Sequence, residues 1–239
     1  MLAFSRAESA TPFMTLLAVF AILLGRRAGQ RSFVVGMAIA GRSRLELEGM
    51  IGFFINVLPL RIELAGAPSF LDLLGRVREI ALAAQSHQDL PLEKLVEELR
   101  TERQADGAPL FQVTFGIQNA PREDARLSGL EIRPFPLSYE TVRFPLTVWV
   151  LQTDDELALQ WTFNTDFFDA STIVRLHEQF EGLLGSALAN PRAEIDELEL
   201  VDASEREQRR RSRQLREASR HQRLMISKPK GLRVVQPNE

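Results

Sequence analysis

Residues 51–61 read IGFFINVLPLR, and the second half of this stretch has the alternation of a β-strand. From Leu58 to Leu64 every second residue is apolar, while Pro59, Arg61 and Glu63 occupy the positions between. Such a period of two is typical of a strand with one buried face. Proline lacks the amide hydrogen that a central strand donates, so Pro59 belongs at the start of a strand or on an edge strand. We therefore expect the strand to begin near Leu58, with residues 51–56 as the approach to it.

Upstream of this strand the sequence predicts a buried helix and a second strand. Ser9 or Thr11 can cap a helix that has Pro12 in its first turn and ends near Gly29. This helix is apolar on all sides, which predicts burial. A membrane span over residues 12–25 is the alternative, but the apolar run is shorter than the ~20 residues that cross a bilayer. The β-branched run 32–41 predicts a short buried strand.

Downstream, helical and strand patterns follow one another to residue 190. The predicted order begins with a helix capped by Ser69 and ending by His87, a short helix from Pro91 and a strand over 111–117. A hairpin of strands 144–151 and 157–163, with its turn at Asp154-Asp155, and a helix that begins at Asp169 or Ser171 follow. Helices bracket strands that occur both singly and in a hairpin. The fold class that this order predicts is α/β, with a mixed sheet covered by helices on at least one face.

Charge divides the chain into an acidic body and a basic tail. Residues 204–239 contain eleven Lys/Arg and four Asp/Glu, so the net charge of -3 for the whole chain leaves residues 1–203 at -10. An acidic body does not favour a nucleic-acid surface, because phosphate binding needs clustered cations. We expect the tail to be disordered or loosely helical, since it has almost no apolar face. The chain has no cysteine, and a cytoplasmic location is the default expectation.

No pattern in the sequence indicates a catalytic or metal centre. Ser86, His87 and Asp89 lie close together in sequence, but neighbours at a helix end point in different directions and do not form a triad. We expect His87 to lie at the negative end of one helix and Asp89 to cap the next. No metal-ligand spacing, phosphate-binding loop or nucleophile elbow is present.

Longer stretches resemble a known family. The segments 10–30, 34–61, 69–99, 109–119 and 163–173 follow one another as in condensation domains of nonribosomal peptide synthetases, over about residues 5–204. What the chain resembles is the C-terminal half of such a domain. The resemblance implies a single chloramphenicol acetyltransferase-like lobe over residues 1–203, with a mixed, mostly antiparallel sheet covered by helices.

The resemblance also implies a function and partners. The family joins an upstream acyl or peptidyl group to a downstream amino acid, both carried as thioesters on the phosphopantetheine arms of carrier proteins. The implied partners are the N-terminal condensation lobe, other synthetase modules and peptidyl carrier proteins, with no directly bound cofactor. The acidic body and the short apolar run separately predict no nucleic acid and no membrane as partners. The family's HHxxxDG motif belongs to the N-terminal lobe and is absent here. We therefore expect no catalytic residue in this chain and no activity from it alone.

The same resemblance marks residues that shape a substrate tunnel or the interface between lobes. It implies that Asn56 satisfies backbone groups where its strand begins; the alternative is a simple turn amide with Phe53 and Phe54 as core residues. The implied site residues are Gly52, Phe53, Phe54, Asn56, Arg61, Gln88, Asp89, Phe111 and Gln112.

Two hypotheses about the function remain open. The chain is either part of a condensation domain, as a fragment or a separately encoded half, or a non-catalytic module that docks on a carrier protein or synthetase. An isolated lobe exposes the apolar face that its partner covers, and such a face binds partners.

Overall fold

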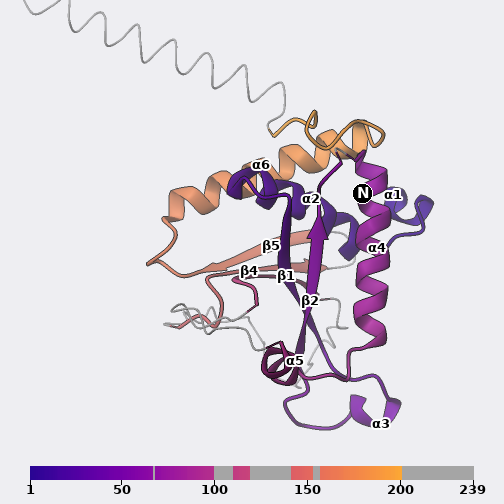
Figure 1. The fold of residues 1–239 in the computed structure, drawn as a ribbon, viewed down its shortest axis with the longest axis vertical. Coiled ribbons are helices and arrows are strands. Elements are labelled where there is room, and N and C mark those ends of the chain that lie inside the picture. Colours follow the sequence, from indigo (N-terminus) through magenta and orange to yellow (C-terminus); the bar gives the residue numbers. More distant parts are fainter. Residues whose placement is uncertain (67, 100–109, 119–140, 153–156, 201–239) are drawn as a thin grey trace, which may run out of the picture. The chain divides into compact units, whose positions relative to one another are not determined.

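The computed structural model describes residues 1–66, 68–99, 110–118, 141–152 and 157–200. The predicted turn at Asp154-Asp155, the apolar run at 130–135 and the basic tail lie outside the described residues. The described part belongs to one compact unit, Met1–Leu200. Its elements are α1 (Leu2–Ala7), α2 (Pro12–Ala28), β1 (Ser32–Ile39), α3 (Leu45–Glu48), β2 (Asn56–Glu63), α4 (Phe70–Ser86), α5 (Leu92–Glu98), β3 (Val113–Gln118), β4 (Leu146–Gln152), β5 (Leu157–Phe163) and α6 (Ala170–Ala189) (Figure 1).

The strands form one mixed sheet in the order β2-β1-β3-β4-β5. Both ends of the sheet are antiparallel, with β1 pairing β2 from Ser32↔Glu63 to Ile39↔Asn56 and β4 pairing β5 from Leu146↔Phe163. The central strands β1, β3 and β4 are parallel. The predicted fold class, including the hairpin of β4 and β5, is confirmed.

Strand β2 lies at the edge of the sheet, which explains how it tolerates a proline. Pro59 pairs with Gly36 of β1, and an edge strand needs ladder hydrogen bonds on one side only. The strand begins at Asn56 rather than near Leu58, because the ladder continues two residues further, to the Asn56↔Ile39 pair. The alternation predicts the buried face correctly but cannot show where pairing begins.

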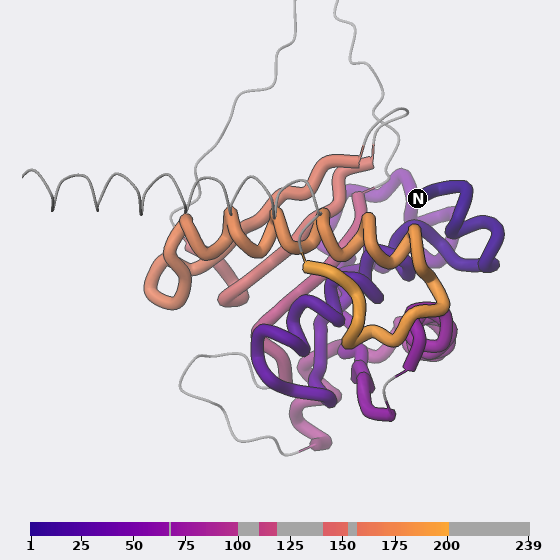
Figure 2. The backbone as a smooth tube through the Cα atoms, turned by 90° about the horizontal axis from the view of Figure 1, so that it is seen from above, coloured from indigo at the N-terminus to yellow at the C-terminus, as the bar shows by residue number. Residues whose placement is uncertain are grey.

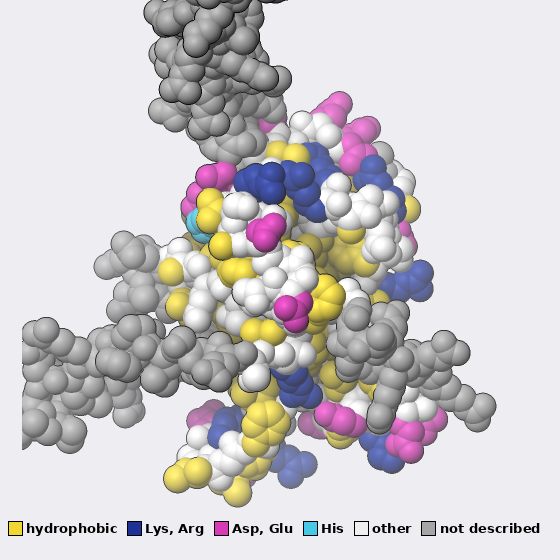
Figure 3. Space-filling view, turned by 90° about the vertical axis from the view of Figure 1, so that its left-hand side faces the viewer, with side chains coloured by type: hydrophobic (Ala, Val, Ile, Leu, Met, Phe, Trp, Pro, Cys, Tyr) yellow, Lys and Arg dark blue, Asp and Glu magenta, His cyan; other side chains and the backbone are white. Residues whose placement is uncertain are grey.

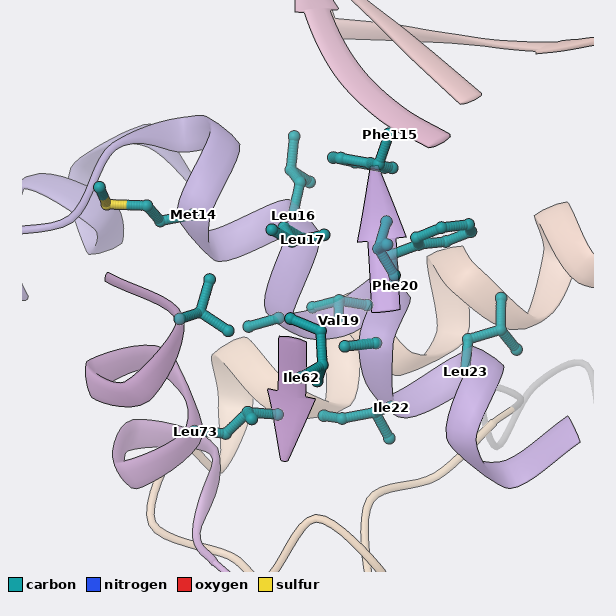
Figure 4. Packing of buried hydrophobic residues seen from close by; sticks show 14 of the residues in the cluster. Met14, Leu16, Leu17, Val19, Phe20, Ile22, Leu23, Ile62, Leu73 and Phe115 are labelled. Atoms are coloured by element: carbon teal, nitrogen blue, oxygen red, sulfur yellow. The ribbon is translucent and has the colours of Figure 1, made fainter. Parts of the chain in front are cut away.

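Helix α2 is the central helix of the core, as its apolar composition predicts. Thr11 caps it by accepting a hydrogen bond from the Met14 amide at 3.2 Å, and it ends at Gly29, whose φ of 64° is left-handed. Its residues Leu16, Leu17, Val19, Phe20, Ile22 and Leu23 are fully buried among Phe115 of β3, Ile62 of β2 and Leu73 of α4 (Figure 4). No helix in the described part is long and apolar enough to cross a membrane.

Helices α4 and α6 pack against α2. In the view from above, α6 crosses in front of α2 (Figure 2). Ser69 caps α4 with a reciprocal hydrogen bond between Ser69 and Asp72, as predicted, and the helix ends at the predicted His87. The first residue of α6 follows Asp169, but the Asp169 side chain makes no cap hydrogen bond. Residues 191–200 then return along the start of α4, where the Phe70 amide donates to the Ala193 carbonyl at 3.1 Å.

Candidate functional site

A cavity of about 320 Å³ lies where the start of β2 meets the connection between α4 and α5. Two segments that are distant in sequence form its walls, residues 53–57 and residues 88–93, with Gly41 and Arg143 completing the lining. Five of the nine predicted site residues line this cavity: Phe53, Phe54, Asn56, Gln88 and Asp89. Their separation along the chain shows that the fold itself brings them together.

Asn56 joins the two walls of the cavity. Its side-chain Nδ2 donates to the backbone carbonyls of Gln88 at 3.0 Å and Leu90 at 2.8 Å. Its Oδ1 accepts from the amide of Val57 at 2.9 Å and from that of Leu92 at 3.3 Å. Every hydrogen-bonding position of the amide is thereby used. Asn56 therefore satisfies backbone groups at the start of its strand, and it also fixes the connection between two helices.

Asn56 also replaces a predicted helix cap. The sequence predicts that Asp89 caps α5, but the N-cap position is Pro91 and no side chain of the helix caps it. The Leu92 amide, in the first turn of α5, donates instead to Asn56. The prediction is wrong because a partner 36 residues away in sequence satisfies the helix end.

Phe54 forms a wall of the cavity and is held by its neighbours. The Arg42 guanidinium carbon lies 4.4 Å from the centroid of its ring, which is cation–π geometry. Gly41 approaches its backbone so closely that a Cβ at this position would lie 1.8 Å from the Phe54 carbonyl oxygen. Gly52 also lies against the ring, where an added Cβ would lie 2.9 Å from Cε2.

The charged residues of the cavity are of both signs. Arg143 Nη2 lies 3.7 Å from Glu93 Oε1, with both side chains largely exposed, so their attraction is screened by water. The Arg143 guanidinium carbon also lies 5.6 Å from the ring centroid of Phe144, whose ring packs against that of Phe111 at 5.4 Å between centroids. Phe111 is therefore linked to the cavity through Phe144 and Arg143, although it does not line the cavity itself.

The remaining predicted site residues lie outside the cavity. Arg61 is exposed further along β2, with its Nε 3.4 Å from Ser32 Oγ. Gln112 is exposed, and its backbone carbonyl accepts from the Leu146 amide at 3.3 Å. Sequence reasoning missed seven residues that line the cavity: Gly41, Ile55, Val57, Pro91, Leu92, Glu93 and Arg143. It also missed Arg42, which packs on the Phe54 ring. The signals for Gly41 and Arg42 are the Gly-Arg pair directly after the β-branched run and their place in the family-like segment 34–61.

Ser86, His87 and His177 make local structural contacts in the described part of the chain. Ser86 Oγ donates to the Ala83 carbonyl at 2.7 Å within its own helix, and His87 ends that helix, so the two do not form a catalytic pair. His177 on α6 accepts from the indole of Trp161 at 3.3 Å and lies 3.6 Å from Glu181, away from the cavity. Within the described ranges no three His, Asp or Glu side chains are grouped as metal ligands would be. The cavity can hold and orient a ligand between an aromatic wall and a polar wall.

Fold and sequence together define the class of this protein. The family described as "Condensation domain" matches residues 2–209, and the chain belongs to that family. One component of the linear gramicidin synthase of Brevibacillus parabrevis is 47% identical over 208 residues, which are 86% of this chain and 3% of that protein. Surfactin synthase subunit 1 of Bacillus subtilis (strain 168) is 34% identical over 203 residues, or 85% of this chain and 6% of that protein. This chain therefore spans a small part of each relative.

Solved structures show the same fold. The X-domain from teicoplanin biosynthesis superposes with a TM-score of 0.75 at 25% identity, covering 82% of this chain and 46% of that one. The condensation domain from the monacolin K polyketide synthase MokA superposes with a TM-score of 0.74 at 23% identity, covering 81% of this chain and 45% of that chain. In both cases less than half of the neighbour is matched.

Proposed function

We propose that this chain is the C-terminal lobe of a condensation domain that forms amide bonds in nonribosomal peptide biosynthesis. The observation that carries the single-lobe proposal is the pair of coverages, since most of this chain matches less than half of the MokA condensation domain and less than half of the teicoplanin X-domain. The resemblance of segments 34–61, 69–99 and 109–119 to the C-terminal half of the family supports the choice of lobe. The family match over residues 2–209 includes the cavity-lining segments 53–57 and 88–93. In this proposal the cavity is part of the wall along which substrates are placed.

The proposed reaction joins an amine to a thioester. The amine nitrogen attacks the thioester carbonyl, and the C–N bond forms as the C–S bond breaks. The proton lost by the amine ends on the departing sulfur, so that the free phosphopantetheine thiol is released. Both substrates arrive on phosphopantetheine arms of peptidyl carrier proteins, so this lobe itself needs no bound cofactor. Its contribution is positioning, which can supply several kcal/mol of a barrier. The HHxxxDG motif is absent from the sequence, so we expect no activity without a companion lobe.

A reconstitution assay tests this proposal. The purified chain is mixed with two loaded carrier proteins, with and without an N-terminal condensation half that carries HHxxxDG, and the amide product is measured by mass spectrometry. We expect product only with the added half. Amide formation by the chain alone would overturn the proposal. An upstream DNA sequence that encodes the motif would support the fragment form of it.

A second candidate function is a non-catalytic docking module for a carrier protein or synthetase. The exposed apolar residues between β1 and β2 favour it, because Leu45, Ile51 and Phe53 are 83%, 104% and 78% exposed. Calorimetric titration with carrier proteins distinguishes the docking module from the condensation lobe. Binding of carrier proteins together with no product in the reconstituted assay would favour the docking module.

A further inference from the structure

The connection between β1 and β2 is a long projection, which we name the arm and define as residues 40–55. The two strands pair as a hairpin, whose loops are usually two to five residues long, and longer loops are often functional. The arm contains α3 and lies at the lower end of the view in Figure 1. Figure 3 shows hydrophobic side chains gathered on the projection at the bottom of the molecule.

The arm has no hydrophobic core of its own. None of its residues is buried, and α3 is a single turn without a buried residue. Met50, Ile51 and Phe53 instead present their side chains to water. A segment of this composition would ordinarily sample many conformations, because no apolar burial offsets the entropy of ordering it.

Arg42 supplies the contacts that hold the arm. Its guanidinium packs over the Phe54 ring at the C-terminal end of the arm. Its Nη1 donates to the carbonyl of Leu47 and lies 3.5 Å from that of Glu48, both in α3. One side chain at the base of the arm therefore contacts its middle and its end.

Gly41 makes this arrangement possible. Its φ of 65° is left-handed, and its Cα lies against the Phe54 carbonyl with no room for a side chain. The turn brings Arg42 onto the face of the Phe54 ring. Gly41, Arg42 and Phe54 thus form a lock at the base of the arm, next to the cavity that Gly41 and Phe54 line.

We propose that Arg42 is a positioning residue that pre-organises the arm as a docking element for the companion lobe. This inference rests on the proposed function for the identity of the partner. The unmatched half of the MokA condensation domain supplies an occupant for the apolar arm. An arm already held in one conformation loses less entropy on binding, so the lock raises its affinity for the companion lobe.

Hydrogen exchange on the chain alone tests the lock. In Arg42→Ala we expect exchange of the Leu47 and Met50 amides, which donate to the carbonyls of Arg44 and Leu47, to rise at least tenfold. Exchange in β1 and β2 and the unfolding midpoint should stay unchanged. Arg42→Lys keeps the charge but not the flat, forked guanidinium, and should give an intermediate rise. Arg44→Ala, which removes a neighbouring cation of the same arm, is the matched control and should leave exchange unchanged. Unchanged exchange in Arg42→Ala, or an equal rise throughout the sheet, would overturn the lock.

The affinity for a companion half tests whether the lock favours docking. The probe is the HHxxxDG-bearing half of a condensation domain from linear gramicidin synthase, and the measurement is the dissociation constant. We expect Arg42→Ala to weaken binding at least fivefold and Arg42→Lys to restore part of it, with Arg44→Ala unchanged. Equal affinity of Arg42→Ala and the natural chain would refute the docking role. The exchange result does not depend on catalysis, so it stands or fails independently of the proposed function.

Discussion

The Asn56 side-chain amide donates to the backbone carbonyl of Leu90 at 2.8 Å, so that an edge strand directly holds the connection between α4 and α5. Three further hydrogen bonds of the same side chain reach Gln88, Val57 and Leu92. The cavity keeps its shape because this one amide joins the elements on either side of it.

Removal of this amide should destabilise the protein. Asn56→Ala leaves two backbone carbonyls and two backbone amides without their partner, and we expect a loss of about 1–3 kcal/mol in the free energy of unfolding. Asn56→Asp keeps an acceptor for the two amides but places a negative charge beside the two carbonyls, so it should not restore stability. Urea denaturation measures both. Gln160→Ala, which removes an exposed amide on β5, is the control, and an equal effect of the two alanine variants would contradict the role of Asn56.

Two glycines with the same backbone conformation provide a second test. Gly29 and Gly41 have φ of 64° and 65°, but a Cβ at Gly29 meets nothing within 4 Å, while one at Gly41 would overlap the Phe54 carbonyl. Gly29→Ala should cost about 1–2 kcal/mol, the cost of a left-handed conformation alone. Gly41→Ala must also displace the arm, and we expect a clearly larger loss. Thermal unfolding of both variants measures the difference, and equal losses would show that the close approach is unimportant.

Substitution of two phenylalanines tests which side chain belongs to the folded core and which to the proposed docking surface. Phe20 is fully buried and stacks on Phe115 at 4.9 Å between centroids, whereas Phe53 is 78% exposed. Phe20→Ala should lower the free energy of unfolding by about 3–5 kcal/mol. Phe53→Ala should change it by less than about 0.5 kcal/mol. A large destabilisation by Phe53→Ala would mean that the arm is part of the folded core.

The ion pair between Arg31 and Asp196 makes stability depend on pH. Hydrogen bonds of 2.7 and 2.8 Å from Arg31 are the main cause that lowers the pKa of Asp196. A carboxyl with a lowered folded-state pKa contributes stability above its unfolded pKa of about 3.9, and the contribution disappears as the pH falls through the folded value. Asp196→Asn should therefore be slightly less stable than the natural chain at pH 6, and the difference should shrink as the pH falls below the unfolded pKa of about 3.9. Both side chains are more than a third exposed, so the effect is small. A difference that grows in acid would contradict this assignment.

The helices and strands that could be predicted are those whose sequence carries a local signal. Pro12 after Thr11 predicts the start of α2, and Ser69 with Asp72 predicts the start of α4. The alternation from Leu58 onward predicts the buried face of β2. By contrast, α1 and α3 are short and lack such signals, so the sequence does not predict them.

In the candidate site, too, some residues carry a signal in the sequence and others do not. The family resemblance marks Phe54, Asn56 and Asp89, but nothing local indicates that Asn56 replaces Asp89 at the start of α5. Likewise, the Gly-Arg pair at residues 41–42 could not be connected to Phe54, because the contact exists only when the arm folds back on itself.

The amino-acid sequence by itself determined the order of most helices and strands and the buried face of β2, since periodicity, caps and proline act through neighbours along the chain. It left open whether Pro59 starts its strand or lies on an edge strand. Tertiary structure alone decided which backbone groups Asn56 satisfies, that Arg42 holds the arm, and that residues 53–57 and 88–93 enclose one cavity. Those features depend on hydrogen bonds and ring contacts between side chains and partners that only the packed fold brings within reach.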